Sequence, residues 1–296
     1  RVLHDGSADG EERLERLTKI GSVYHERIGD VAKAFAALAE ALRGAPESEE
    51  TLGRLEILAA EREAFPELVA LVQELAGAVE DPVLSRTLWI KAATMQDSQL
   101  GDVDGAVGSY LKCLDIDAGD LEILGALEAL YRRTSRWRDL VGVLRRRAEL
   151  SQDPIEQEDL LAQMAGIHDA QLGEPHEAIR VFKEILEIDP ASQRALTALD
   201  ELFARQAMWS DLADNVDRQL TLAQDPDVQI GLMNRLADLR ETKMSAPEAA
   251  IEIYRQVLER DASNAPALAA LERLLNEPQH QVVIAEILEP IYQAAS

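Results

Sequence analysis

The stretch from Leu172 to Pro190, LGEPHEAIRVFKEILEIDP, predicts a tight turn followed by one amphipathic helix. Gly173 suits a left-handed turn position, and Glu174 places an acid at the start of the following helix. The helix carries a broad apolar stripe at helical spacing, formed by Ala178, Ile179, Val181, Phe182, Ile185, Leu186 and Ile188. A stripe this wide indicates a helix that packs on two sides.

The same pattern recurs along the chain at a fixed interval. Gly29, Gly101 and Gly173 lie 72 residues apart, and Ser245 holds the fourth position. Other registers keep this period, with alanine at 34, 106, 178 and 250, leucine at 55, 127, 199 and 271, and aspartate at 9, 81, 153 and 225. Because no strand pattern interrupts it, the period predicts a helical array in which each helix pair contacts its neighbours.

Turn residues mark the ends of the predicted helices. The glycines suit left-handed positions after one helix, and the Asp-Pro pairs at 81, 153 and 225 suit the start of another, where Asp caps and Pro occupies the first turn. A left-handed serine would be strained by about 1 kcal/mol. We therefore expect the turn at Ser245 to differ, through Ala246-Pro247.

These residues resemble the tetratricopeptide repeat, which has a turn glycine, a small alanine, an aromatic residue and a closing proline. Gly173, Ala178, Phe182 and Pro190 follow that order, and Trp89 occupies the family's tryptophan position. The small position of the first helix is held by Gly21, Ala93, Ala165 and Ala237. The second half of each interval is more divergent, since leucine at 68, 140 and 212 replaces the second alanine.

The resemblance covers nearly all of residues 11–296 and implies an all-α fold, a right-handed superhelical α-solenoid of antiparallel helix hairpins. We expect four double repeats, 11–82, 83–154, 155–226 and 227–296, in one continuous solenoid domain. Asp9-Gly10 stands where later intervals have Asp-Pro, so residues 1–10 are predicted to be the tail of a preceding repeat in a longer protein. We place Trp89, Trp137, Trp209, Tyr110 and Phe182 in hairpin cores rather than on a stacking platform.

Charge excludes some partners. The formal net charge of −25 disfavours nucleic acid and anionic membrane surfaces. Residues 83–154 carry only −1, against −8, −10 and −5 in the other double repeats. The difference comes from an arginine cluster, Arg132, Arg133, Arg136, Arg138, Arg145, Arg146 and Arg147. It could receive an acidic peptide or another copy of the chain, or it could pair internally with Glu122, Glu128 and Asp139.

The resemblance implies that the first helix of each hairpin lines a groove for peptides. By register, the residues expected to face this groove are Thr87, Ile90, Thr94, Asp97, Glu122, Arg132, Arg133, Asp169 and Arg194. The lysines and asparagines with which some family members clamp a terminal carboxylate are not recognisable at these positions. Glycines at 53 and 125 and alanine at 269 either leave room for a partner backbone or tighten the curvature.

Catalytic and metal-binding patterns are scarce. The five histidines lack metal-ligand spacing, no glycine loop is suited to phosphate, and Cys113 falls in an apolar helix register. No apolar run is long enough to span a membrane. We therefore expect no enzyme activity, metal or cofactor, and we expect Cys113 to be a small buried residue.

The sequence predicts a protein-interaction scaffold that binds a peptide or protein along the groove, with the partner unidentified. The alternative is a structural spacer that self-associates through its repeat ends, since Val282, Val283, Ile287 and Tyr292 make the last helix apolar on more than one side. High arginine and alanine content indicates a bacterial source, and long bacterial repeat arrays are similar. No compartment is assigned, and the cytoplasm is only the default expectation.

Overall fold

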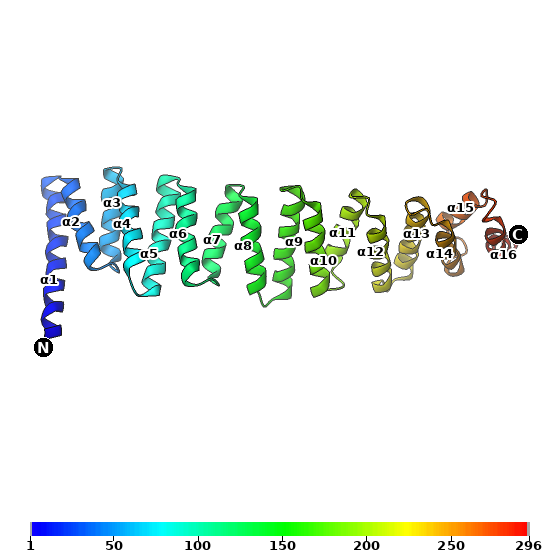
Figure 1. Cartoon of the computed structure of the whole chain (residues 1–296), viewed down its shortest axis with the longest axis horizontal. Coiled ribbons are helices and arrows are strands. Elements are labelled where there is room, and N and C mark those ends of the chain that lie inside the picture. The colour runs from blue at the N-terminus through cyan, green and yellow to red at the C-terminus, as the bar shows by residue number, and fades with distance from the viewer. Residues whose placement is uncertain (1, 295–296) are drawn as a thin grey trace. The chain divides into compact units, whose positions relative to one another are not determined.

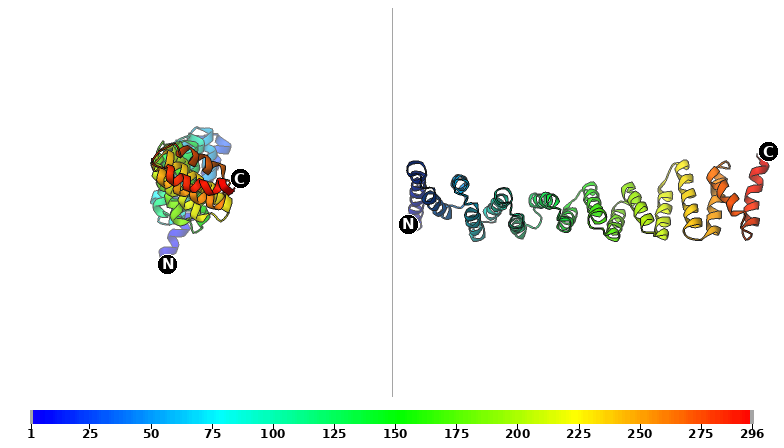
Figure 2. Two further views of the ribbon diagram at one scale, coloured as in Figure 1. Left: turned by 90° about the vertical axis from the view of Figure 1, so that its right-hand side faces the viewer. Right: turned by 90° about the horizontal axis from the view of Figure 1, so that it is seen from above.

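A computed structural model describes the backbone of residues 2–294 and the side chains of residues 10 and 12–293, and in this part of the chain all regular structure is helical (Figure 1). The chain divides into two compact units, unit 1 (Arg1–Val143) and unit 2 (Leu144–Ser296), with the boundary inside helix α8. Within each unit, consecutive helices pack as antiparallel pairs, which is the arrangement of an α-solenoid (Figure 2).

The first eight helices begin in unit 1, and two of them end in short π-helical segments, η1 and η2. Their bounds are α1 (Val2–Ser22), η1 (Val23–Ile28), α2 (Val31–Gly44), α3 (Glu49–Glu61), α4 (Phe65–Ala78), α5 (Pro82–Met95), η2 (Gln96–Leu100), α6 (Val103–Ile116), α7 (Leu121–Arg133) and α8 (Trp137–Leu150). Unit 2 continues with α9 (Pro154–Ala170), α10 (Pro175–Ile188), α11 (Gln193–Arg205), α12 (Trp209–Leu222), α13 (Pro226–Thr242), α14 (Pro247–Arg260), α15 (Ala265–Leu274) and α16 (Gln281–Ala294).

The helix starts follow the predicted 72-residue period. Helices α2, α6, α10 and α14 begin at residues 31, 103, 175 and 247, and α4, α8, α12 and α16 begin at 65, 137, 209 and 281. The odd-numbered helix of each pair is called the first helix below, and the even-numbered helix is called the second helix. This spacing confirms the register on which the sequence prediction rests.

Small and apolar residues at the repeated positions form the core. Ala34, Ala106, Ala178 and Ala250 are fully buried, as are the leucines at 55, 127 and 271, with Leu199 nearly so. A Cβ on Gly21 would lie 2.8 Å from the Leu38 side chain, so α1 and α2 approach closely there. These positions therefore tolerate little added volume.

The turn at Ser245 does not differ from the glycine turns, and that prediction was wrong. Ser245 has φ 52°, close to the φ of 74°, 63° and 66° at Gly29, Gly101 and Gly173. The next amide donates to the carbonyl six residues back in every case, as in Ala246 to Arg240 at 2.8 Å. The fourth turn keeps the shared geometry and accepts a strained serine to do so.

Left-handed residues also close the turns inside the second half of each interval, where no glycine marks them. Glu63, Ser135 and Ala207 have φ of 55°, 57° and 53° and themselves recur at the 72-residue period. In each turn the following amide bonds to the carbonyl five residues back, as in Met208 to Phe203 at 2.9 Å. These turns follow the repeat register although their sequence gives no turn signal.

The Asp-Pro pairs start helices as predicted. Asp81, Asp153 and Asp225 accept hydrogen bonds from the amides two residues on at 2.8–2.9 Å, and Pro follows at the first helical position. Asp9-Gly10 is different, because α1 runs through it without a break. The assignment of residues 1–10 to a preceding repeat therefore stays a prediction.

The aromatic residues divide into two groups. Phe182 is buried, and Trp89 packs against the core of unit 1. Tyr110, Trp137 and Trp209 are half-buried, and the Lys243 ammonium lies 5.4 Å from the Trp209 ring centre. The core placement is confirmed for Phe182. Trp89 is partly buried against the core, and Tyr110, Trp137 and Trp209 are partly buried as well, the two tryptophans at helix starts.

Candidate functional site

The predicted groove residues lie on the first helices, and most of the charged ones form ion pairs within the chain. The first-helix face is defined here as the exposed side of α5 and α7 in unit 1 and of α9 and α11 in unit 2. In unit 1 the Arg133 guanidinium pairs with Asp97, and in unit 2 the Arg205 guanidinium lies 2.6 Å from Asp169. Both pairs join residues 36 positions apart, at the carboxyl ends of consecutive first helices.

A second row of contacts joins the amino-terminal ends of the same helices. Arg86 of α5 donates to Asp120 at 2.5 and 3.2 Å and to Glu122 at 2.6 Å. In unit 2, Arg194 donates to Asp159 at 2.5 Å. The structure thus brings Glu122 and Arg194 into equivalent positions, each paired with the preceding first helix.

Asp120 is the least exposed carboxylate of these rows, with 8% of its side chain exposed. It also caps α7, since it accepts from the amides of Glu122 and Ile123 at 3.1 and 3.2 Å. The hydrogen bond from Arg86 holds the pKa of the Asp120 carboxyl below its ordinary value, and the same contact raises the pKa of Arg86. This junction of cap and ion pair fixes α7 against α5.

Much of the middle of the first-helix face in unit 1 carries small or apolar side chains, with Lys91 as its cation. The Thr87 and Thr94 hydroxyls each donate at 2.9 Å to a carbonyl of their own helix, at Val83 and Ile90. Ile90 is half-buried between them. On α7, a Cβ built at Gly125 would meet no atom within 4 Å. Thr87, Ile90, Thr94 and Gly125 thus form a strip between the two rows of ion pairs. Its hydroxyl groups are hydrogen-bonded, and there is open space at Gly125.

The arginine cluster is also engaged in contacts within the chain. In unit 1, Arg132 pairs with Glu128 at 2.8 Å, and Arg136 pairs with Asp104 at 2.6 Å and with Asp139 at 2.9 Å. In unit 2, the partners of Arg145, Arg146 and Arg147 are Glu184, Glu149 and Glu156, and Arg138 in unit 1 has a partner as well. Two of the three expected acids, Glu128 and Asp139, serve the cluster, whereas Glu122 pairs with Arg86.

Cys113 is fully buried, as predicted, and burial raises the pKa of its thiol to about 11. It therefore stays protonated at neutral pH and is a poor nucleophile. Among the described residues, no group of three or more His, Cys, Asp or Glu side chains is arranged to hold a metal ion. None of the helices in residues 2–294 has the length and hydropathy required to cross a membrane.

Comparison with known proteins identifies the repeat. Residues 123–157 match the family model described as tetratricopeptide repeat. The match covers most of α7, all of α8 and the first residues of α9, in a half of the interval where we expected the repeat to be more divergent. A search of curated protein sequences found no match.

Several solved structures are similar to the chain. A tetratricopeptide repeat protein from Parabacteroides merdae has 14% identity and a TM-score of 0.33, with 88% of this chain and 98% of that one covered. YrrB, described as a TPR protein with an unusual peptide-binding site, has 15% identity and a TM-score of 0.33, with 71% and 98% covered. The TPR2AB domain of yeast Sti1 in its pHSP90 complex has 12% identity and a TM-score of 0.33, with 97% and 100% covered. Similarity at this level transfers no ligand to this chain.

Proposed function

Because the chain is a tetratricopeptide-repeat protein, we propose that it is a non-enzymatic scaffold that binds a peptide or protein on its first-helix face. The observation that carries the proposal is the strip between the two rows of ion pairs. Its hydroxyls are bonded to their own helix, so a partner contacts methyl groups and open backbone at Thr87, Ile90, Thr94 and Gly125. The flanking pairs, Asp97–Arg133 and Arg86–Glu122, fix the spacing of α5 and α7.

The charged residues of the face have two roles in this proposal. Arg133 and Glu122 pair with the neighbouring first helix, whereas Arg132 pairs with Glu128 of its own helix. All three also present donors and acceptors at the edges of the strip. In unit 2, Asp169 and Arg194 hold the same positions relative to α11 and α9. Exposed ion pairs contribute only about 0–1 kcal/mol each, so exchanging one for a contact with a partner costs little.

A blocking substitution tests the face. Thr94→Trp places a large side chain on the strip and is expected to abolish capture of a specific partner by the full-length protein. Leu111→Trp is the matched control, because Leu111 is exposed on the second helix α6 of the same unit. Equal capture by both variants would contradict the proposal.

The contribution of charge is tested separately. The double variant Arg132→Glu/Arg133→Glu is expected to weaken binding and to reduce its salt dependence. An Asp97→Arg/Arg133→Asp exchange keeps an ion pair between α5 and α7 and serves as the control. If the exchange restores binding, the pair acts by holding the helices. If it does not, Arg133 contacts the partner directly.

A structural spacer is the second candidate. Val282 is 71% exposed, and Ala285 of α16 is exposed where its equivalent Ala213 in α12 is buried. Self-association through this surface predicts a mass that rises with concentration in light scattering. A monomer at all concentrations that captures a specific protein favours the scaffold.

A further inference from the structure

Two grooves in unit 2 lie at equivalent places between successive second helices. One lies between α10 and α12 and the other between α14 and α16, and each has a volume of about 420 Å³. Their lining residues correspond at the 72-residue period. The pairs are Lys183 and Arg255, Leu186 and Leu258, Glu187 and Glu259, Asp211 and Val283, Asp214 and Glu286, Asn215 and Ile287, and Arg218 and Pro290.

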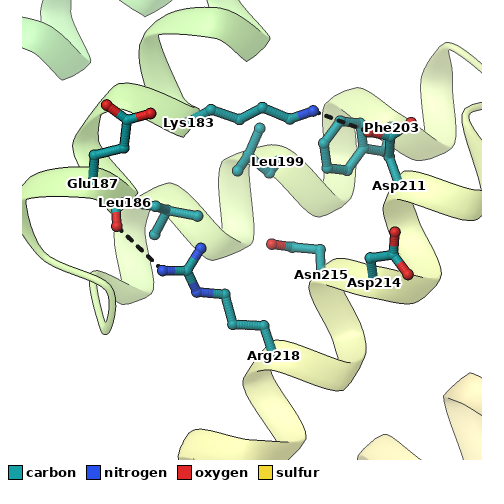
Figure 3. A pocket seen from close by; sticks show the side chains of 9 residues that line it. All are labelled: Lys183, Leu186, Glu187, Leu199, Phe203, Asp211, Asp214, Asn215 and Arg218. Atoms are coloured by element: carbon teal, nitrogen blue, oxygen red, sulfur yellow. Dashed lines mark hydrogen bonds and ion pairs between the residues drawn. The ribbon is translucent and has the colours of Figure 1, made fainter.

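Polar side chains bridge the groove between α10 and α12. Figure 3 shows Lys183 reaching across to Asp211 at 3.0 Å and Arg218 donating to the Leu186 carbonyl at 3.2 Å. The Asn215 amide donates to the Leu196 carbonyl at 2.9 Å. The polar groups of this groove are therefore used to hold α12 against α10 and α11.

In the groove between α14 and α16, the residues at three of the equivalent positions cannot form such polar contacts. Val283, Ile287 and Pro290 have no polar side-chain group, so none of them can form the contacts made by their equivalents in α12. Arg255 pairs instead with Glu252 and Glu259 of its own helix. The result is an apolar strip, in which Val283 is 52% exposed and Ile287 and Ile291 are half-buried.

The helix that follows in the repeat order does not cover such a groove. Helix α13 packs on α12, yet the equivalent groove beside α10 stays open. Ala285 is exposed where its equivalent Ala213 is buried, and it does not line the groove between α14 and α16. This groove is thus a lateral surface, separate from the surface that stacks on a next repeat.

The rim of the groove is acidic. Glu259 and Glu286 line it, and α16 carries Glu286 and Glu289 with no lysine or arginine. Arg255 also lines the groove, but it is shared by Glu252 and Glu259, so one negative charge of these three side chains is not balanced. Charge complementarity therefore favours a cationic partner. A second copy of this chain, with a formal net charge of −25, is disfavoured by the same rim.

We propose that the groove between α14 and α16 binds a basic amphipathic helix of a partner protein. Val283, Ile287 and Ile291 are spaced four residues apart along α16 and face Leu258 of α14. They would receive the apolar face of such a helix, whose lysines and arginines meet Glu259 and Glu286. This site is on the second helices and does not depend on the first-helix face.

The test measures binding of a labelled probe peptide to the full chain by fluorescence anisotropy. The probe is a helix of about five turns with leucines at i, i+4 and i+7 and lysines on both flanks. Its control has glutamate in place of every lysine. We expect the basic probe to bind, the acidic probe not to bind, and affinity to fall with added salt.

Matched variants locate the site. Val283→Asp and Ile287→Asn install the residues found in the groove between α10 and α12, and each is expected to weaken the basic probe about tenfold or more. Val228→Asp adds the same charge at an exposed valine of α13 in the same unit, outside both proposed sites, and should leave probe binding unchanged. Val283→Asp is expected to remain folded because Val283 is exposed, and far-ultraviolet circular dichroism is the check.

Three outcomes overturn the proposal. They are no binding of the basic probe up to about 1 mM, equal binding by the native chain and Val283→Asp, or equal binding of both probes. Sedimentation of the chain alone provides a separate check. A dimer that Val283→Asp dissociates would assign the groove to a second copy instead.

Discussion

Replacing Ser245 with glycine should stabilise the turn between α13 and α14. Ser245 has φ 52°, a left-handed conformation that costs an L-residue about 1–2 kcal/mol. Glycine removes this strain but loses about 0.5–1 kcal/mol through the greater freedom of the unfolded chain. From the middle of each range the net gain is about 0.75 kcal/mol, and no packing is lost because Ser245 is exposed.

Hydrogen exchange is the appropriate assay, because helical arrays unfold locally and a single melting curve averages over many repeats. The Met244 and Ala246 amides bond to the Leu239 and Arg240 carbonyls at 3.1 and 2.8 Å and report directly on this turn. A gain of this size slows their exchange about two- to fivefold.

The equivalent turn in the preceding double repeat supplies the control. Gly173→Ser should speed exchange at Glu174, whose amide bonds to the His168 carbonyl at 2.7 Å, by a similar factor. Unchanged or faster exchange in Ser245→Gly, together with faster exchange in Gly173→Ser, would refute the strain assigned to Ser245.

Three further substitutions test the packing and the caps. Ala178→Leu should lower the melting temperature of unit 2, because Ala178 is fully buried and overpacking costs about 1–3 kcal/mol; unchanged melting would contradict the repeat register. The pKa of Asp120 is lowered in the folded chain, so its stabilisation is full above the ordinary carboxyl pKa and is lost as pH falls through the lowered value. Acid titration of Asp120→Asn against the native chain should show a stability difference at neutral pH that disappears in strong acid, and a constant difference would contradict the linkage. Gly105→Ala should destabilise α6 although alanine normally favours helices by about 0.5–1 kcal/mol, because the new Cβ would clash with the Asp102 carboxylate that caps the helix and with the buried Gln96 amide. Gly108→Ala in the same helix, with open space at its Cβ, should be neutral or stabilising, and equal effects of the two in thermal unfolding would count against the clash.

The period, the helix starts and the Asp-Pro caps could be predicted from sequence because each has a local signal. The turns at Glu63, Ser135 and Ala207 could not, since their residue types do not favour a left-handed backbone and only packing imposes it. At Ser245 the prediction relied on the low preference of serine for a left-handed backbone and therefore expected a different turn. The geometry of equivalent turns at the same register was the better guide.

The helices that carry the candidate residues could be predicted, but the contacts of these residues were not. The sequence placed Asp97, Arg133, Asp169 and Arg194 on the first helices, and the structure shows that each pairs with a residue of a neighbouring first helix. The signal was available, because opposite charges 36 residues apart, half the period, face each other in consecutive first helices. The prediction grouped the arginines by their closeness in the sequence. That grouping did not indicate which acid, half a period away, each arginine pairs with.

The two grooves have the same position in the 72-residue repeat but are lined by different kinds of side chain, polar in one and apolar in the other. This difference is their most informative feature. Helices α12 and α16 begin at equivalent positions, and the buried Leu212 and Val216 of α12 correspond to the buried Ile284 and Leu288 of α16. The fold therefore does not require Val283 where α12 has Asp211. An exposed valine contributes little to folding, because burial of apolar area is what stabilises. Pro290 removes one backbone hydrogen bond inside α16, at a cost of about 3 kcal/mol in a regular helix. Residues that do not stabilise the fold can be selected for binding. Val283 and Pro290 are such residues, and they distinguish the groove between α14 and α16 from the polar groove between α10 and α12.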